Sequence, residues 1–101
     1  MLELGGPLAT PLPGGQWVGC GWEGGVVAYG GSTLGDASPD EALAAVVGYS
    51  TFNDVTSRRA QRLTTQWILG KNGDGSGPLG PMVPAHEVGD LRDGLRVQTR
   101  V

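Results

Sequence analysis

The stretch GYSTFNDVTSRRAQ, residues 48–61, places one carboxylate between an apolar, β-prone run and a pair of arginines. Asp54 therefore follows a segment that we expect to be a buried strand. A carboxylate in that position must be hydrogen-bonded, ion-paired or bound to a metal ion, because leaving it unpaired costs several kcal/mol. The local sequence leaves two roles open. Asp54 either pairs with Arg58 at the start of a helix or supplies an oxygen ligand to a divalent cation.

Two other charged residues stand in glycine-rich surroundings. Glu23 lies in WEGGVVAYGG, and Lys71 lies in LGKNGDGSGPLGP. The second segment is not a phosphate-binding P-loop, because no Lys-Ser or Lys-Thr pair follows its glycines at the required spacing. Taken alone, Lys71 is an exposed loop lysine and Asp74 a turn residue. Any chemical role for either residue depends on the sequence around it.

The elements that must position these residues are short. The segment WEGGVVAY, residues 22–29, predicts a strand that is weakened by its two glycines. A helix is predicted to start at Ser38, with proline in its first turn at Pro39 and a capping-box partner at Glu41. We expect Gly48 to end this helix, because glycine is the usual residue just beyond a helix C-terminus.

The carboxylate and the arginines then fall at a junction between a strand and a helix. Residues 49–55 predict the strand, and Thr56 or Ser57 is expected to cap a second short helix in SRRAQRL. Another strand is expected near residues 82–83, followed by a turn over residues 89–94. The Asp54 side chain should therefore lie where backbone direction changes.

The final residues, LRVQTRV, alternate apolar and polar side chains, and this pattern predicts a strand with one buried face. No turn or cap follows Val101. That is the expected appearance of a fragment rather than of a complete domain.

The chain is short and rich in glycine, with 101 residues and 19 glycines, which allows one small domain at most. Its net charge is −3 without a basic block, which argues against a nucleic-acid surface. No apolar run approaches the roughly 20 residues that span a bilayer, and no positive charge precedes the first apolar residues as in a secretory signal. Cys20 is alone, so no internal disulfide forms, and His86 is expected to be exposed. We expect a cytoplasmic protein that binds neither nucleic acid nor membranes.

The strings SPDEALAAVVGYSTFNDVTSRRAQ, TQWILGKNGDGSGPLGP and HEVGD, in this order and spacing, resemble the fumarylacetoacetate hydrolase family. The resemblance covers residues 22–101 and implies an α+β fold: a partial mixed β-roll of the fumarylacetoacetase C-terminal type with two short helices. It assigns residues 22–101 to the N-terminal part of an incomplete catalytic domain. Residues 1–21 are then an irregular N-terminal segment rich in Gly and Pro.

Members of this family hydrolyse, decarboxylate or isomerise 2-oxo and 2,4-dioxo acids at a divalent metal. The resemblance therefore implies that Asp54 and Glu23 are ligands of Mg²⁺ or Mn²⁺, which prefer carboxylate oxygens and water. It implies that Lys71 holds the anionic or enolate oxygens of the substrate. Arg58 and Gln61 also stand at family positions and complete the expected catalytic set.

The sequence departs from the family pattern at three places. The family has two glutamates two residues apart on one strand face, but this chain has only Glu23 there. Depending on the register, the missing glutamate corresponds to Gly25 or to Gly21. In addition, Arg59 stands where aspartate is usual, and Gly73 replaces a phenylalanine. These departures predict that a metal ion binds weakly or not at all.

Two functions of different class follow. The resemblance implies a divalent-metal-dependent hydrolase or lyase that acts on C–C bonds of 2-oxo or 2,4-dioxo acids and forms a homodimer. The alternative is a non-catalytic, truncated remnant of the family that acts as a structural or interaction protein.

Overall fold

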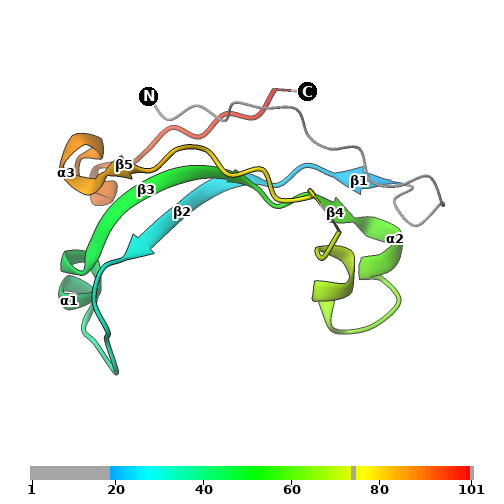
Figure 1. Ribbon diagram of the computed structural model, residues 1–101, viewed down its shortest axis with the longest axis horizontal. Coiled ribbons are helices and arrows are strands. Elements are labelled where there is room, and N and C mark those ends of the chain that lie inside the picture. The colour runs from blue at the N-terminus through cyan, green and yellow to red at the C-terminus, as the bar shows by residue number, and fades with distance from the viewer. Residues whose placement is uncertain (1–18, 74, 101) are drawn as a thin grey trace.

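The computed structural model describes residues 19–73 and 75–100. Residues 1–18, which make up most of the predicted N-terminal segment, lie outside the described residues, as do Asp74 and Val101. The described chain is elongated, with extents of 44 × 31 × 20 Å. A long curved pair of strands forms its middle and short helices lie toward both ends (Figure 1). The α+β class expected from the resemblance is confirmed.

The larger sheet has the strand order β2-β3-β5, and its pairings are antiparallel. Strand β2 (Gly24–Gly30) pairs along its whole length with β3 (Val46–Asn53), and the other edge of β3 pairs with β5 (Val83–Pro84). A second, two-stranded sheet joins β1 (Cys20–Gly21) to β4 (Thr56–Ser57). Both sheets therefore bring the start of the described chain beside the segment around Asp54.

The core of the described chain is small. Its buried hydrophobic residues are Tyr49 and Val55, which expose 3% and 2% of their surface. Most of the other buried side chains are short and polar, and they lie on β3, on β4 and in the glycine-rich loop. A hydroxyl such as that of Ser50 is satisfied by backbone, donating to the carbonyl oxygen of Gly80 over 2.7 Å. The short polar residues let three segments of backbone approach closely.

Helix α1 (Pro39–Ala44) starts as the sequence predicts. The Ser38 hydroxyl accepts from the Glu41 N–H, and the Ser38 N–H donates to Glu41 Oε2 over 2.8 Å. The predicted end at Gly48 is wrong, because the helix ends at Ala44 with Ala45 as its C-cap. Gly48 instead lies buried in β3, where a Cβ atom would be 2.8 Å from the carbonyl oxygen of Val83. The glycine is needed for the close approach of β5, which local sequence could not reveal.

The second predicted helix forms one turn. Helix α2 (Arg58–Gln61) is capped by Ser57, whose hydroxyl accepts from the Ala60 N–H. A 3-10 helix, η1 (Trp67–Gly70), follows after a short loop and leads directly into Lys71. The two turns contact each other, so they hold the residues around Arg58 and Lys71 together.

The structure adds a one-turn helix that the sequence pattern did not predict. Helix α3 (Ala85–Val88) precedes the predicted turn, which contains the 3-10 helix η2 (Leu91–Asp93). His86 is exposed, as expected. These elements lie at the opposite end of the molecule from α2 (Figure 1).

The predicted final strand is wrong. Residues 94–100 have no regular secondary structure, and Leu95 and Val97 expose 42% and 51% of their surface. Alternation produces a strand only where a neighbouring strand edge completes the backbone hydrogen bonds. Here the segment meets β2 through a side chain, since Thr99 lies against Gly24.

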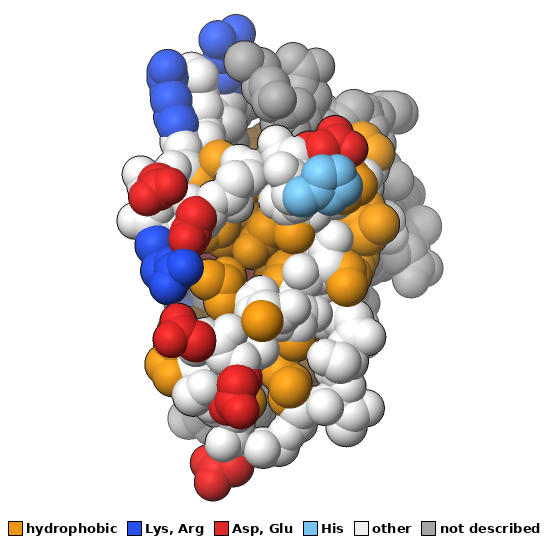
Figure 2. All heavy atoms as spheres, turned by 90° about the vertical axis from the view of Figure 1, so that its left-hand side faces the viewer, with side chains coloured by type: hydrophobic (Ala, Val, Ile, Leu, Met, Phe, Trp, Pro, Cys, Tyr) orange, Lys and Arg blue, Asp and Glu red, His pale blue; other side chains and the backbone are white. Residues whose placement is uncertain are grey.

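Hydrophobic side chains gather across the middle of the molecular face at the α1 and α3 end, with acidic side chains around them (Figure 2). Large apolar residues such as Val47 and Met82 are half exposed. Within residues 19–73 and 75–100, no helix has the length and hydrophobicity needed to cross a membrane.

Candidate functional site

The carboxylate of Glu23 is the centre of a polar cluster. Its Oε1 accepts from Thr56 Oγ1 over 2.9 Å and lies 2.7 Å from Arg58 Nη1. Its Oε2 accepts from Lys71 Nζ over 2.8 Å. Both carboxylate oxygens are therefore engaged by cations or a hydroxyl.

Backbone hydrogen bonds hold Glu23 at this position, directly before β2. Its carbonyl oxygen accepts from the Asp54 N–H over 3.1 Å, and its own N–H donates to Asn53 Oδ1 over 2.9 Å. The antiparallel register of β2 and β3 thus places Glu23 opposite Asp54, although the two residues are far apart in sequence.

The ammonium group of Lys71 joins the two carboxylates. Besides its bond to Glu23, Nζ donates to Asp54 Oδ2 over 2.5 Å and to Thr56 Oγ1 over 3.0 Å. An ammonium group has three N–H donors, and here each one has an acceptor. Together with Arg58, the cluster contains two negative and two positive charges and is neutral overall.

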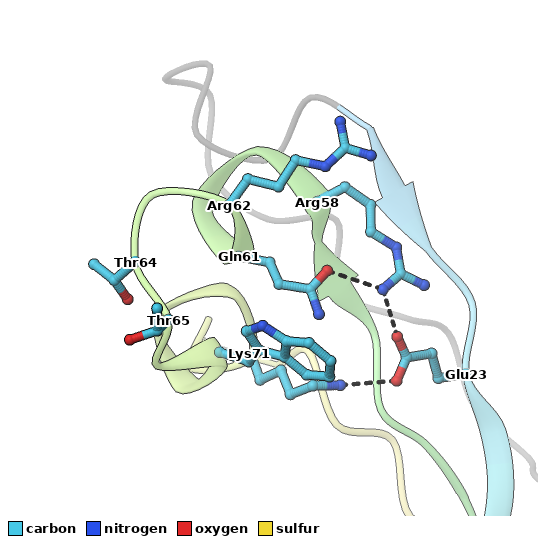
Figure 3. A pocket seen from close by; sticks show the side chains of 8 residues that line it. Glu23, Arg58, Gln61, Arg62, Thr64, Thr65 and Lys71 are labelled. Atoms are coloured by element: carbon cyan, nitrogen blue, oxygen red, sulfur yellow. Dashed lines mark hydrogen bonds and ion pairs between the residues drawn. The ribbon is translucent and has the colours of Figure 1, made fainter.

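The guanidinium group of Arg58 lies between Glu23 and Gln61. Nη1 approaches Glu23 and donates to Gln61 Oε1 over 3.1 Å (Figure 3). The rest of the guanidinium covers Gly21, where a Cβ atom would lie 2.5 Å from both Nε and Nη2. Gly25 lies in open space, with nothing within 4 Å of an added Cβ. Both glycines alternate with Glu23 along the chain and share its half-buried face.

This arrangement shifts two acid–base equilibria. The hydrogen bond from Lys71 lowers the pKa of Glu23 to about 2, with further help from Thr56 and Arg58 against a smaller opposing effect of burial. Burial works to lower the pKa of Lys71, but the hydrogen bonds to Asp54 and Glu23 outweigh it and raise that pKa above its usual value. Glu23 and Lys71 are therefore both charged at neutral pH.

Four of the residues predicted from the sequence line one open cavity of about 630 Å³: Glu23, Arg58, Gln61 and Lys71. Asp54, the fifth, reaches the same cluster through Lys71. The predicted alternative, an ion pair between Asp54 and Arg58, is wrong: the two side chains do not pair with each other. Each takes a distant partner instead, because the β2–β3 register brings Glu23 to Arg58 and the glycine-rich loop brings Lys71 to Asp54.

The remaining residues that line the cavity come from the loop after α2 and from the start of η1: Arg62, Thr64, Thr65 and Trp67. Sequence reasoning missed Arg62 and both threonines as site residues, and it also missed Thr56 at the centre of the cluster. The cation at position 62 lies four residues after Arg58, a spacing that places both on one side of a helix. That spacing is the one sequence feature that could have identified Arg62 as a site residue.

The family model described as fumarylacetoacetate (FAA) hydrolase C-terminal matches residues 5–101. The chain belongs to the fumarylacetoacetate hydrolase family. A crystal structure of a family protein from Yersinia pestis superimposes with a TM-score of 0.68 at 28% identity, covering 80% of this chain and 39% of that protein.

Two relatives in the family have names that state an activity. A 2,4-didehydro-3-deoxy-L-rhamnonate hydrolase from Sphingomonas is 43% identical over an alignment of 79 residues that covers 68% of this chain and 28% of the relative. An oxaloacetate tautomerase from Bacillus subtilis is 34% identical over 64 residues, 63% of this chain and 21% of the relative. The chain thus spans less than a third of the length of either protein.

The family's dependence on divalent metals can be tested against the donor groups of this chain. Glu23 Oε2 and Asp54 Oδ2 both lie within hydrogen-bonding distance of one positive atom, Lys71 Nζ. The two carboxylates thus already share a cation, and Mg²⁺ or Mn²⁺ accepts one or two carboxylates when water completes its shell. Within the described parts of the chain, no group of three or more His, Cys, Asp or Glu side chains converges. The residues fit a divalent ion held by two carboxylates, provided that the Lys71 ammonium moves aside.

Proposed function

We propose that this chain contributes the polar site of a fumarylacetoacetate hydrolase family enzyme, a divalent-metal-dependent hydrolase or lyase that acts on C–C bonds of 2-oxo or 2,4-dioxo acids. One observation carries the proposal. Four of the residues that the resemblance singled out line a single cavity, and the fifth is ion-paired within the same cluster. Glu23 directly precedes β2, Asp54 directly follows β3, Arg58 and Gln61 lie on α2, and Lys71 follows η1, so their convergence is a property of the fold.

Lys71 is the group that we assign to the anionic oxygen of the substrate. It stays charged because two carboxylates face it, and a fixed cation stabilises negative charge that develops on an oxygen when a C–C bond breaks. All three of its N–H donors already have acceptors. The contact with Thr56 Oγ1 is the least costly of these to exchange for a substrate oxygen, since it is the longest of the three at 3.0 Å and its acceptor is neutral. With Glu23 and Asp54 holding a metal ion, the other two N–H donors would be released as well.

Gln61 and Arg58 act as a pair in this proposal. The Gln61 carboxamide oxygen accepts from Arg58, so its NH₂ group is the part left to donate to a substrate oxygen. Arg58 in turn is fixed by Glu23. Its role is to orient Gln61 and Glu23 and to raise the positive charge at the cavity wall.

Glu23 and Asp54 are the residues that would hold Mg²⁺ or Mn²⁺. When bound, such an ion polarises the carbonyl oxygens of an oxo acid and stabilises enolate charge. The names of the two relatives agree with this substrate class, since a tautomerase of oxaloacetate and a hydrolase of a didehydro sugar acid both handle oxo acids.

Binding of oxalate, a stable mimic of the enolate of a 2-oxo acid, tests the proposal. We expect the protein to bind oxalate by calorimetry and Lys71→Met to weaken this binding by about tenfold or more, because one charge-assisted contact is lost. Arg59→Gln is the matched control, since it removes one positive charge from an exposed residue outside the cavity. Equal loss in both variants would show only non-specific attraction of the anion and would contradict the assigned role of Lys71.

A second function, that of a structural or interaction protein, is favoured by the exposed apolar side chains. Leu63 and Ile68 expose 69% and 72% of their surface in the same segment as the cavity-lining residues Thr64 and Trp67, and an exposed apolar patch often marks a contact with another chain. We propose a homodimer in the cytoplasm, in which residues 22–101 form the N-terminal part of the catalytic domain. Sedimentation equilibrium over a range of concentrations tests the dimer, and a monomer at every concentration would contradict it.

A further inference from the structure

Arg62 differs from the other cations of the cavity. Lys71 has an acceptor for every N–H donor, and Arg58 is ion-paired with Glu23. The side chain of Arg62 makes no hydrogen bond or ion pair with any residue in the described parts of the chain. Because the charges around Glu23 already cancel, Arg62 gives the cavity its surplus positive charge.

The fold places this free cation apart from the Lys71 ammonium. Arg62 is the C-cap of α2, one turn after Arg58. In Figure 3 it lies on the far side of Arg58 and Gln61 from Lys71, at the other end of the cavity wall. The cavity therefore offers two separate positions for negative charge, one at Lys71 and one at Arg62.

We infer that Arg62 recognises a second carboxylate of the ligand, so that the cavity selects 2-oxo acids with two carboxylates over those with one. This inference rests on the proposed function, because it assigns the first anionic end of the ligand to the Lys71 end of the cavity. A guanidinium group with all five N–H donors free binds a carboxylate through two parallel hydrogen bonds. The simpler role, a solvated arginine at the end of a helix, gives no preference between the two kinds of acid.

The test compares 2-oxobutyrate with 2-oxoglutarate and 2-oxoadipate, binding each to the intact protein by calorimetry at low ionic strength. We expect at least one diacid to bind about tenfold tighter than the monoacid, as one charge-assisted contact predicts. Arg62→Gln should remove this preference and leave the affinity for 2-oxobutyrate unchanged. Arg62→Lys should retain part of it, because lysine keeps the charge but loses the paired geometry.

Arg59→Gln serves as the matched control, because it makes the same change of charge on the same short helix but outside the cavity. It should keep the full preference for the diacid. Inorganic phosphate is the second control, and binding of phosphate as tight as that of the diacid would overturn the selection of a carboxylate.

The outcomes separate this inference from the proposed function. If monoacid and diacids bind equally to the parent, or if Arg62→Gln behaves as Arg59→Gln does, the role of Arg62 is overturned while oxo-acid binding stands. If no acid binds at millimolar concentration, both are overturned. Both exchanged residues are exposed, so equal melting temperatures for the variants will show that folding does not cause the difference.

Discussion

The polar cluster around Glu23 and the loop after α2 border the same cavity but are built in opposite ways. In the cluster, every charge has a partner of opposite sign, and the backbone hydrogen bond from Asp54 N–H to the Glu23 carbonyl oxygen fixes its position. In the loop region, residues 62–69 from the end of α2 into η1, all side chains are exposed and Arg62 has no partner in the described chain. Paired charges resist rearrangement, whereas exposed, unpaired groups adapt to a ligand at little cost. The comparison indicates that the residues of the cluster carry out the proposed reaction, whereas the loop region selects which ligand binds.

Removing Glu23, the centre of the cluster, should have the largest effect on the free energy of unfolding. Glu23→Ala leaves the cations of Lys71 and Arg58 without their shared carboxylate, so we expect a loss of about 2 kcal/mol in the free energy of unfolding. This figure lies below that for a fully buried pair, because the Glu23 side chain is 34% exposed. Urea denaturation measures it. A loss no larger than that of Arg59→Gln would show that the cluster does not stabilise the fold.

The next largest effect is expected at low pH, where protonation of Glu23 should weaken the cluster and lower the stability of the fold. The pKa of Glu23 is about 2 in the folded chain and 4.5 as the ordinary value, so the folded state favours the charged form. The stability that Glu23 contributes is therefore complete above pH 4.5 and is lost as the pH falls from 4.5 towards 2. Thermal melts across this window should show a steeper decline for the parent than for Glu23→Gln. Parallel curves would mean that Glu23 is not held by Lys71.

The smallest effect on stability is expected in the loop. Ile68 is 72% exposed, so Ile68→Ser should change the free energy of unfolding by no more than about 0.5 kcal/mol. The same change should weaken self-association, if this side chain lies in a dimer interface. Denaturation and sedimentation on the same sample check both expectations. A large loss of stability would show that the loop is part of the core, and the contrast between the two regions would fail.

Much of the local structure could be predicted because its causes lie within a few residues. The start of α1 follows from Ser38 and Glu41, which reach each other across one helical turn. The cap of α2 at Ser57 has the same origin. The errors arose where a distant segment decides. Gly48 is a residue type that often ends a helix, but it lies against β5, and the alternating residues 95–100 lack the neighbouring strand that a strand pattern requires.

For the site, the sequence determined the residue types and the family, because the motifs that carry Glu23, Asp54 and Lys71 are contiguous strings. Only the tertiary structure decided which charge meets which. Lys71 and Glu23 are 48 residues apart, and their contact exists because η1 turns the chain back over the end of the β2–β3 pair. Tertiary structure also explains why Arg62 has no partner in the described chain. The register of β2 and β3 brings the Glu23 carboxylate to Arg58, which forms the ion pair instead. Capping depends on one turn of backbone, whereas ion pairing depends on where the whole chain places each side chain.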